Sequence, residues 1–182
     1  RIDGAGKKVT RSDNCRVSDL SVSSDNLTFT YEAKSLPYPI DTSYYDNEKH
    51  TQADALSVIP FMDEMNYEGL SVSGLSDGYY GLTIGGEFIG RFTARELERG
   101  INMALLQNTP QYKQAMKIRQ MNEERWLKER KMREFYWVEY NLMRKTGMLW
   151  ACNEAAVDTL RKYRPHDIFL QWNGALWLQY MH

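Results

Sequence analysis

The sequence predicts an α+β fold, in which a mainly antiparallel β module precedes a long α-helix and a shorter returning helical segment. Before residue 93, short stretches of alternating apolar and polar residues recur between turn residues, without the spacing of βαβ units. From Pro110 onward, neither Pro nor Gly interrupts the chain until Gly147. We therefore expect a β-rich module over residues 1–108 and a helical part with an apolar tail over residues 109–182.

A β-hairpin is predicted between residues 80 and 92. Large apolar residues alternate with Gly and Thr over residues 80–84, which is the period of a strand. Gly85-Gly86 suits a two-residue turn, because glycine tolerates positive φ at both central positions. Residues 88–92 then form the return strand.

A short helix is predicted directly after this hairpin. Thr93 and Glu96 match the Thr-x-x-Glu capping box that marks a helix N-terminus. Gly100 can end the helix by adopting a left-handed conformation.

The remainder of the β module is predicted to contain further short elements. Two prolines in segment 36–40 keep it extended and exclude it from the centre of a sheet. We expect strands within residues 1–10 with a turn at residues 4–6, a hairpin over 17–22 and 27–31, a loop over 41–51, helical turns within 53–65, and a strand over 67–72.

A long helix is predicted over residues 110–146. Thr109 suits the N-cap position, and Pro110 suits the first helical position, where its missing N–H is not needed. Such a helix would be roughly 55 Å long at 1.5 Å per residue. Gly147 is expected to end it.

The chain after Gly147 is predicted to return as helices. Residues 148–163 form a second, shorter helix in this prediction, and Pro165 ends it. The apolar tail over residues 168–181 favours a short helix over a strand. A tail this apolar is expected to cover a core or a partner.

Charge is unevenly distributed along the chain. Residues 1–100 carry ten Lys and Arg against sixteen Asp and Glu, whereas residues 101–182 carry thirteen against eight. An acidic module beside a basic helical part explains this distribution better than a nucleic-acid surface does, because acidic residues interrupt the basic helix and weaken attraction to phosphate. We therefore expect no nucleic-acid partner. The chain has no apolar run of about 18 residues, so we also expect no membrane span. The interrupting residues are Glu123, Glu124, Glu129, Glu134 and Glu139.

Several motifs of the chain resemble the region that follows the catalytic domain in a group of bacterial SGNH (GDSL-type) hydrolases. The resemblance covers roughly residues 1–150 and weakens after that. It implies a parent protein that hydrolyses ester or acyl bonds, often on carbohydrate-linked groups, and a periplasmic or extracellular location. The motifs are Gly100-Ile-Asn-Met-Ala-Leu-Leu, Asn108-Thr-Pro-Gln-Tyr-Lys-Gln-Ala115, Arg133-Glu-Phe-Tyr-Trp-Val-Glu-Tyr-Asn141, and the segments 17–22, 27–31, 36–40 and 78–99.

The catalytic motifs of SGNH hydrolases are missing from this sequence. That family uses a Gly-Asp-Ser block, an oxyanion-hole Gly, a Gly-x-Asn-Asp block and an Asp-x-x-His block, and none of the four occurs here. The resemblance therefore implies that residue 1 follows the catalytic domain and that a Ser-His-Asp site lies outside this chain. We expect no catalytic residue within it.

One serine fits a different nucleophile motif. Ser76 lies in Gly74-Leu-Ser-Asp-Gly78, which matches G-x-S-x-G. That motif exposes its serine only between a strand and a helix, and a strand is predicted after Gly78, so an ordinary turn is favoured. The three histidines, His50, His166 and His182, have no evident nucleophile or orienting carboxylate nearby, so we expect them to be solvated or capping residues.

The sequence predicts no metal site and no cofactor. Cys15 and Cys152 can pair, remain free or serve as small buried apolar residues, and neither has metal-ligand spacing. Gly85-Gly86 and Gly90 lack the Lys and the βαβ context of a phosphate-binding loop.

The favoured function is a non-catalytic, structural accessory part of an SGNH-like esterase or lipase. Its partner would be the catalytic domain of the same parent protein or another copy of itself. A carbohydrate-binding β module with exposed aromatic residues is the alternative, and an independent serine hydrolase using Ser76 is a weaker one. Trp126, Trp137 and Trp150 stand at helical positions and are expected in the core, which disfavours stacking on sugars.

Overall fold

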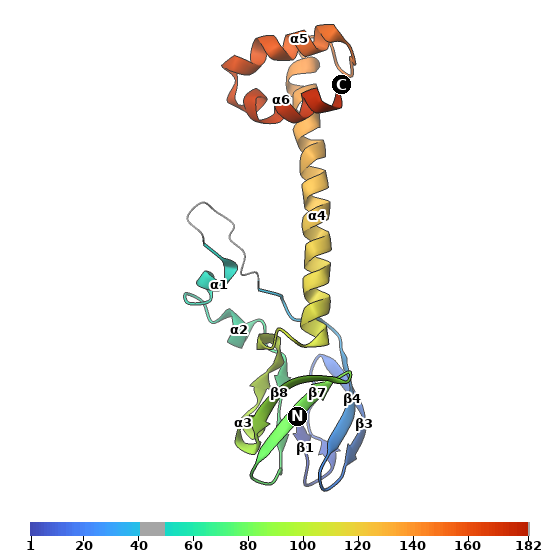
Figure 1. The fold of residues 1–182 in the computed structure, drawn as a ribbon, viewed down its shortest axis with the longest axis vertical. Coiled ribbons are helices and arrows are strands. Elements are labelled where there is room, and N and C mark those ends of the chain that lie inside the picture. Colours follow the sequence, from blue (N-terminus) through green and yellow to red (C-terminus); the bar gives the residue numbers. More distant parts are fainter. Residues whose placement is uncertain (41–49, 182) are drawn as a thin grey trace. The chain divides into compact units, whose positions relative to one another are not determined.

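The computed structural model describes residues 1–40 and 50–181. It confirms the predicted α+β fold. The chain divides into two compact units, residues 1–119 and residues 120–182. The boundary falls within the long helix α4, Pro110–Val138 (Figure 1).

Two β-hairpins dominate the first unit, as the sequence predicts. Strand β3 (Cys15–Val22) pairs with β4 (Leu27–Ala33), and β7 (Tyr79–Ile84) pairs with β8 (Glu87–Thr93) (Figure 1). Gly85 and Gly86 have φ values of 59° and 85°, which explains the need for glycine at both positions of this turn. Each hairpin forms a separate two-stranded sheet.

Short strands complete the β structure. Strand β1 (Ile2–Asp3) pairs antiparallel with β2 (Lys8–Val9) and parallel with β6 (Val72–Ser73). Strand β5 (Gly69–Leu70) pairs antiparallel with β9 (Ile101–Asn102). The sheets are therefore mainly antiparallel, as predicted.

Short helices connect these strands. Helices α1 (Gln52–Ala55) and α2 (Phe61–Glu64) confirm the predicted helical turns, and residues 103–105 form the 3₁₀ helix η1. Segment 36–40 is not part of a strand, as its prolines predict. The predicted loop over residues 41–51 lies largely outside the described residues.

Helix α3 (Ala94–Arg99) begins with the predicted capping box. The Thr93 hydroxyl accepts a hydrogen bond from the Glu96 N–H at 3.2 Å, and the Thr93 N–H donates to a Glu96 carboxylate oxygen at 2.7 Å. Gly100 ends the helix with a φ of 99°.

The first unit has a small core. Ile2, Leu70, Val72, Leu97 and Met103 are buried together, and each comes from a different short element. The inward-facing residues of the hairpins pack against this group but remain only partly buried. They include Leu20, Leu27, Phe29, Tyr31, Tyr80, Leu82, Ile84 and Phe92.

Helix α4 begins as predicted. The Thr109 side chain is 1% exposed, and its hydroxyl accepts a hydrogen bond from the Tyr112 N–H at 3.2 Å. At its end the helix widens into one π-helical stretch, η2 (Glu139–Met143), in which the Arg144 N–H donates to the Glu139 carbonyl at 2.8 Å. Gly147 follows with a φ of 75°.

The second predicted helix starts later than expected. Helix α5 covers Glu154–Tyr163, so the prediction of helix from residue 148 was wrong. Trp150 has a φ of 62°, which interrupts a right-handed helix, and the Asn153 side chain caps α5 by accepting from the Ala156 N–H at 3.0 Å. Pro165 lies in the 3₁₀ helix η3 (Arg164–His166). The tail forms helix α6 (Ile168–Tyr180), as predicted.

The core of the second unit is fully enclosed. Its buried residues come from α4, η2, α5 and α6: Val138, Leu142, Met143, Ala156, Val157, Leu160, Leu170 and Trp177. In the part of the chain that the structure describes, no helix is both long and apolar enough to cross a membrane.

Two of the three tryptophans predicted in the core are exposed. Trp126 is 45% exposed and Trp150 is 47% exposed, whereas Trp137 is half-buried. Trp126 lies on a charged stretch of α4, with the guanidinium carbons of Arg130 and Arg133 about 6 Å from its ring centre. The core tryptophan is Trp177, which the sequence pattern did not single out.

Removing the α3 cap should destabilise the first unit. We expect Thr93→Ala to lower the free energy of unfolding by about 1 kcal/mol, because the Glu96 N–H loses its acceptor. Urea denaturation followed by circular dichroism measures the change. Thr93→Ser keeps the hydroxyl and should restore most of the loss; a Ser variant as unstable as the Ala variant would contradict the capping role.

Candidate functional site

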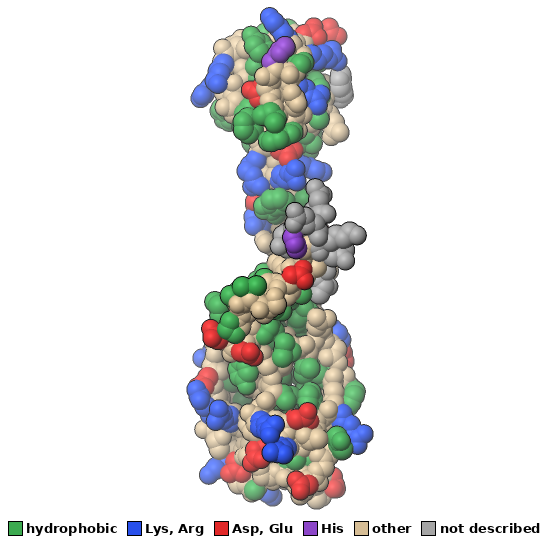
Figure 2. All heavy atoms as spheres, turned by 90° about the vertical axis from the view of Figure 1, so that its left-hand side faces the viewer, with side chains coloured by type: hydrophobic (Ala, Val, Ile, Leu, Met, Phe, Trp, Pro, Cys, Tyr) green, Lys and Arg blue, Asp and Glu red, His purple; other side chains and the backbone are tan. Residues whose placement is uncertain are grey.

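A cavity of about 820 Å³ lies in the first unit. Residues of β3 and β4 line it on one side, and residues of β7 line it on another. Its apolar lining includes Leu27, Phe29, Leu82, Ile84 and Met103. Leu27 and Phe29 alternate along β4, and Leu82 and Ile84 alternate along β7, so the strand period directs both pairs to the same space. Figure 2 shows hydrophobic side chains gathered in a hollowed part of the face of this unit.

Three arginines line the same cavity. Hydrogen bonds connect the segments that carry them. The Arg11 N–H donates to the Arg1 carbonyl at 3.3 Å. The Ile2 N–H donates to the Ser71 carbonyl at 2.9 Å, and the Ser71 hydroxyl donates to the Glu98 carbonyl at 3.1 Å. Arg11 forms an ion pair with Asp13. Among the described residues, Arg1 and Arg99 form no ion pair, although the Arg99 charge acts at longer range on Glu96. The lining therefore combines apolar side chains of the two hairpins with neutral polar side chains and excess positive charge.

A buried carboxyl group lies behind the cavity wall. The Tyr31 hydroxyl, on a residue that lines the cavity, donates to Glu68 Oε1 at 2.9 Å. Burial raises the pKa of Glu68, and the hydrogen bond from Tyr31 opposes that rise only in part. Burial, together with the Glu68 charge, also raises the pKa of Tyr31. Glu68 Oε2 is buried without a hydrogen-bond partner among the described residues, as is Oε1 of Gln111 in the cavity lining.

Two asparagines position Glu68. The Asn102 side chain accepts from the Glu68 N–H at 2.9 Å and donates to the carbonyls of Met62 and Asn66 at 2.8 and 3.1 Å. The Asn66 amide in turn bonds both backbone groups of Tyr38, accepting at 2.8 Å and donating at 2.9 Å. These side-chain hydrogen bonds take the place of strand pairing. They connect the proline segment, residues 36–40, to the residues beside β5 and to β9.

The second unit has its own buried carboxylate. Glu139 is 2% exposed. Its Oε1 accepts from the Trp177 indole N–H at 2.6 Å, and its Oε2 accepts from the Trp150 N–H at 2.8 Å. No Lys, Arg or His of the described chain pairs with it. One side chain therefore joins η2, the turn before α5 and helix α6.

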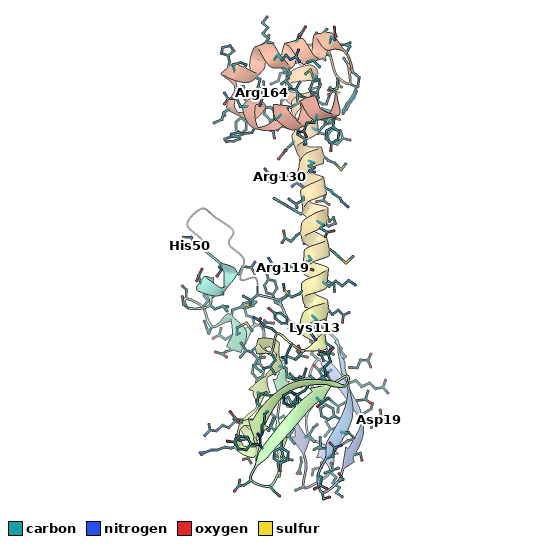
Figure 3. All side chains as sticks on the ribbon, viewed as in Figure 1. Asp19, His50, Lys113, Arg119, Arg130 and Arg164 are labelled. Atoms are coloured by element: carbon teal, nitrogen blue, oxygen red, sulfur yellow. The ribbon has the colours of Figure 1, made fainter. Side chains whose placement is uncertain are left out.

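Among the residues that the structure describes, Ser76 is not brought together with a histidine and a carboxylate. Ser76 lies in the turn between β6 and β7, its carbonyl accepts from the Tyr80 hydroxyl at 2.8 Å, and strand β7 follows immediately. The helix required after a G-x-S-x-G nucleophile is therefore missing. His50 precedes α1 (Figure 3), His166 lies in η3 of the other unit, and His182 falls outside the described residues. Within the described chain, no hydrogen bond joins Ser76 to a histidine.

The two cysteines are free thiols in different units. Cys15 is half-buried and lines the cavity, whereas Cys152 is exposed. Over residues 1–40 and 50–181, no group of three or more His, Cys, Asp or Glu side chains could hold a metal ion.

Aromatic residues on the hairpin surface do not form an open stacking platform. Tyr79 is 66% exposed, but the Arg91 guanidinium carbon lies 4.5 Å from its ring centre and covers one face. Phe88 is also exposed and lies against Gly81. The carbohydrate-binding alternative gains no support from these residues.

Comparison with known proteins identifies two similarities. Residues 116–182 match the family model described as the diltiazem deacetylase C-terminal helical domain. The whole chain is similar to part of a solved structure described as a gut microbial diltiazem-metabolizing enzyme, with 34% identity and a TM-score of 0.86. The chain spans 41% of the length of that enzyme. No curated protein matches the sequence.

Neutralising Glu68 should flatten the pH dependence of stability. Because its pKa is raised in the folded state, the folded chain loses stability as pH rises from the ordinary glutamate pKa through the folded value. We expect Glu68→Gln to abolish this loss, so that the free energy of unfolding of the variant, relative to that of the wild type, rises with pH. The Tyr31 hydroxyl keeps an acceptor in this variant. Urea unfolding at several pH values between about 4 and 7 measures the effect. The exposed Glu64→Gln is the control, and an equal response of both variants would contradict the assignment.

Removing the Glu139 carboxylate should destabilise the second unit strongly. Glu139→Ala leaves the Trp177 indole N–H buried without an acceptor and opens a cavity, so we expect a loss of about 3 kcal/mol. Thermal unfolding followed by tryptophan fluorescence measures it. Glu139→Gln keeps one acceptor and should lose less. A double-mutant cycle with Trp177→Phe should give a coupling energy; strict additivity would argue against the interaction.

Proposed function

We propose that this chain is a non-catalytic C-terminal accessory part of an esterase-type hydrolase. The observation that carries the proposal is the similarity of the entire chain to less than half of a longer diltiazem-metabolizing enzyme, together with the match of residues 116–182 to a deacetylase C-terminal domain. A deacetylase removes an acyl group by hydrolysis, which agrees with the ester or acyl hydrolysis implied by the SGNH resemblance. We further propose an SGNH-type catalytic domain, with the reacting Ser, His and Asp outside these 182 residues.

The geometry of the chain supports a structural role. The described residues bring together no serine, histidine and carboxylate, and the buried carboxyls of Glu68 and Glu139 bond to structural partners. In this proposal, residues 1–108 and 109–182 act as two accessory parts that pack on the catalytic domain of the same parent protein or on another copy of the chain.

An exposed aromatic surface on the second unit suits such packing. Trp137, Phe169 and Trp172 form a contiguous group, with ring centres 5.6 and 5.7 Å apart, and Phe169 and Trp172 are 51% and 64% exposed. Exposed aromatic groups of this kind are typical of surfaces that bind protein.

The chain alone should not hydrolyse esters. We expect p-nitrophenyl acetate turnover by the purified chain to equal that of buffer, and Ser76→Ala to change nothing. Turnover that disappears in Ser76→Ala would contradict the proposal.

Binding of the chain to a separately produced catalytic domain of the parent protein, measured by calorimetry, tests the packing role. Phe169→Ala with Trp172→Ala should weaken it at least tenfold, and the exposed Lys128→Ala is the matched control.

A further inference from the structure

We propose that the cavity of the first unit is a binding site for an anionic amphiphile, a carboxylate with a medium-length aliphatic tail. The inference does not depend on the proposed esterase parentage. It comes from the lining, which combines apolar side chains of two hairpins with more arginines than acidic residues.

The volume and the walls fit an apolar tail. Ligand sites are typically 300–1,000 Å³, and this cavity of about 820 Å³ falls in that range. Leu27 and Phe29 on β4 and Leu82 and Ile84 on β7 belong to hairpins that share no backbone pairing. Their side chains pack against the core group and stay partly buried. An aliphatic chain inserted between the hairpins would remove these surfaces from water.

The charges select the head group. Arg1, Arg11 and Arg99 line the cavity, and Asp13, which pairs with Arg11, is the acidic residue in the lining. Within residues 1–40 and 50–181, neither Arg1 nor Arg99 forms an ion pair. A guanidinium group can bind a carboxylate through two parallel hydrogen bonds. A cationic or purely hydrocarbon ligand would leave these groups unused.

The half-buried Glu68 does not cancel this preference. It accepts a hydrogen bond from Tyr31 behind the wall and is not itself part of the lining. The cavity therefore carries a net positive lining on the side that a ligand meets.

The two thiols provide a direct assay. Cys15 lines the cavity, and Cys152 is exposed in the other unit. Alkylation of the 182-residue chain by N-ethylmaleimide, followed residue by residue by mass spectrometry, reports occupancy at Cys15 and provides an internal control at Cys152. We expect saturating dodecanoate, kept below its micellar concentration, to slow alkylation of Cys15 at least tenfold and to leave Cys152 unchanged.

Variants separate the tail from the head group. Leu82→Trp should fill the cavity and abolish protection of Cys15 by dodecanoate. Arg99 is exposed, so Arg99→Gln should leave folding intact. This variant should raise the dodecanoate concentration needed for half-protection of Cys15 about threefold. The same variant should leave protection by dodecanol unchanged, because the alcohol has no charge. Trp172→Ala in the second unit is the control and should not alter protection.

Three results would overturn the proposal. Equal protection of both cysteines would indicate non-specific adsorption of the amphiphile. Dodecanol protecting as well as dodecanoate, with no effect of Arg99→Gln, would remove the anionic head group from the assignment. If dodecanoate gives no protection, and Cys15 of the full-length parent protein already fails to react with N-ethylmaleimide, the cavity is filled by a segment of the parent protein and not by a ligand.

Discussion

Buried and half-buried side chains that hydrogen-bond to the backbone of distant segments hold this chain together where its regular elements are too short to do so. In the first unit, several strands have only two residues, so backbone ladders alone provide few bonds. Asn66 and Asn102 supply the missing bonds and link the proline segment, α2, β5 and the start of η1. In the second unit, Glu139 does the same for three segments. Asn66 and Glu139 are buried and Asn102 is half-buried, so losing their partners would carry a cost of desolvation.

The separation of the two hairpins explains the cavity. A β-sandwich normally closes because its sheets extend far enough for their inner faces to interdigitate. Here the two long hairpins are separate two-stranded sheets, and the buried core group that their inward-facing residues pack against comes from the short elements. The hairpins therefore bring apolar side chains to a common space without filling it.

Much of the fold could be predicted because its signals are local. The Gly85-Gly86 turn, the Thr93–Glu96 capping box and the Thr109-Pro110 helix start each depend on residues a few positions apart. Long-range features could not be predicted in this way. Asn66 and Asn102 resemble ordinary loop residues until their partners, about 28 to 40 positions away, are known. The start of α5 was misplaced because Trp150 adopts a positive φ that its side chain does not favour, in a turn fixed by Glu139. The cavity and its arginines depend on tertiary pairing of β1 and β6, which no local pattern encodes.

All five tryptophans, at positions 126, 137, 150, 172 and 177, belong to the second unit, whereas the first unit has only tyrosine and phenylalanine as aromatic residues. Selective excitation near the red edge of indole absorption would therefore report on the helical bundle alone. Emission from Trp177, whose ring is fully enclosed, should shift toward longer wavelength when that bundle opens, even while the hairpins remain intact. The placement of this one amino-acid type gives the molecule a built-in spectroscopic label that distinguishes melting of one half from melting of the other.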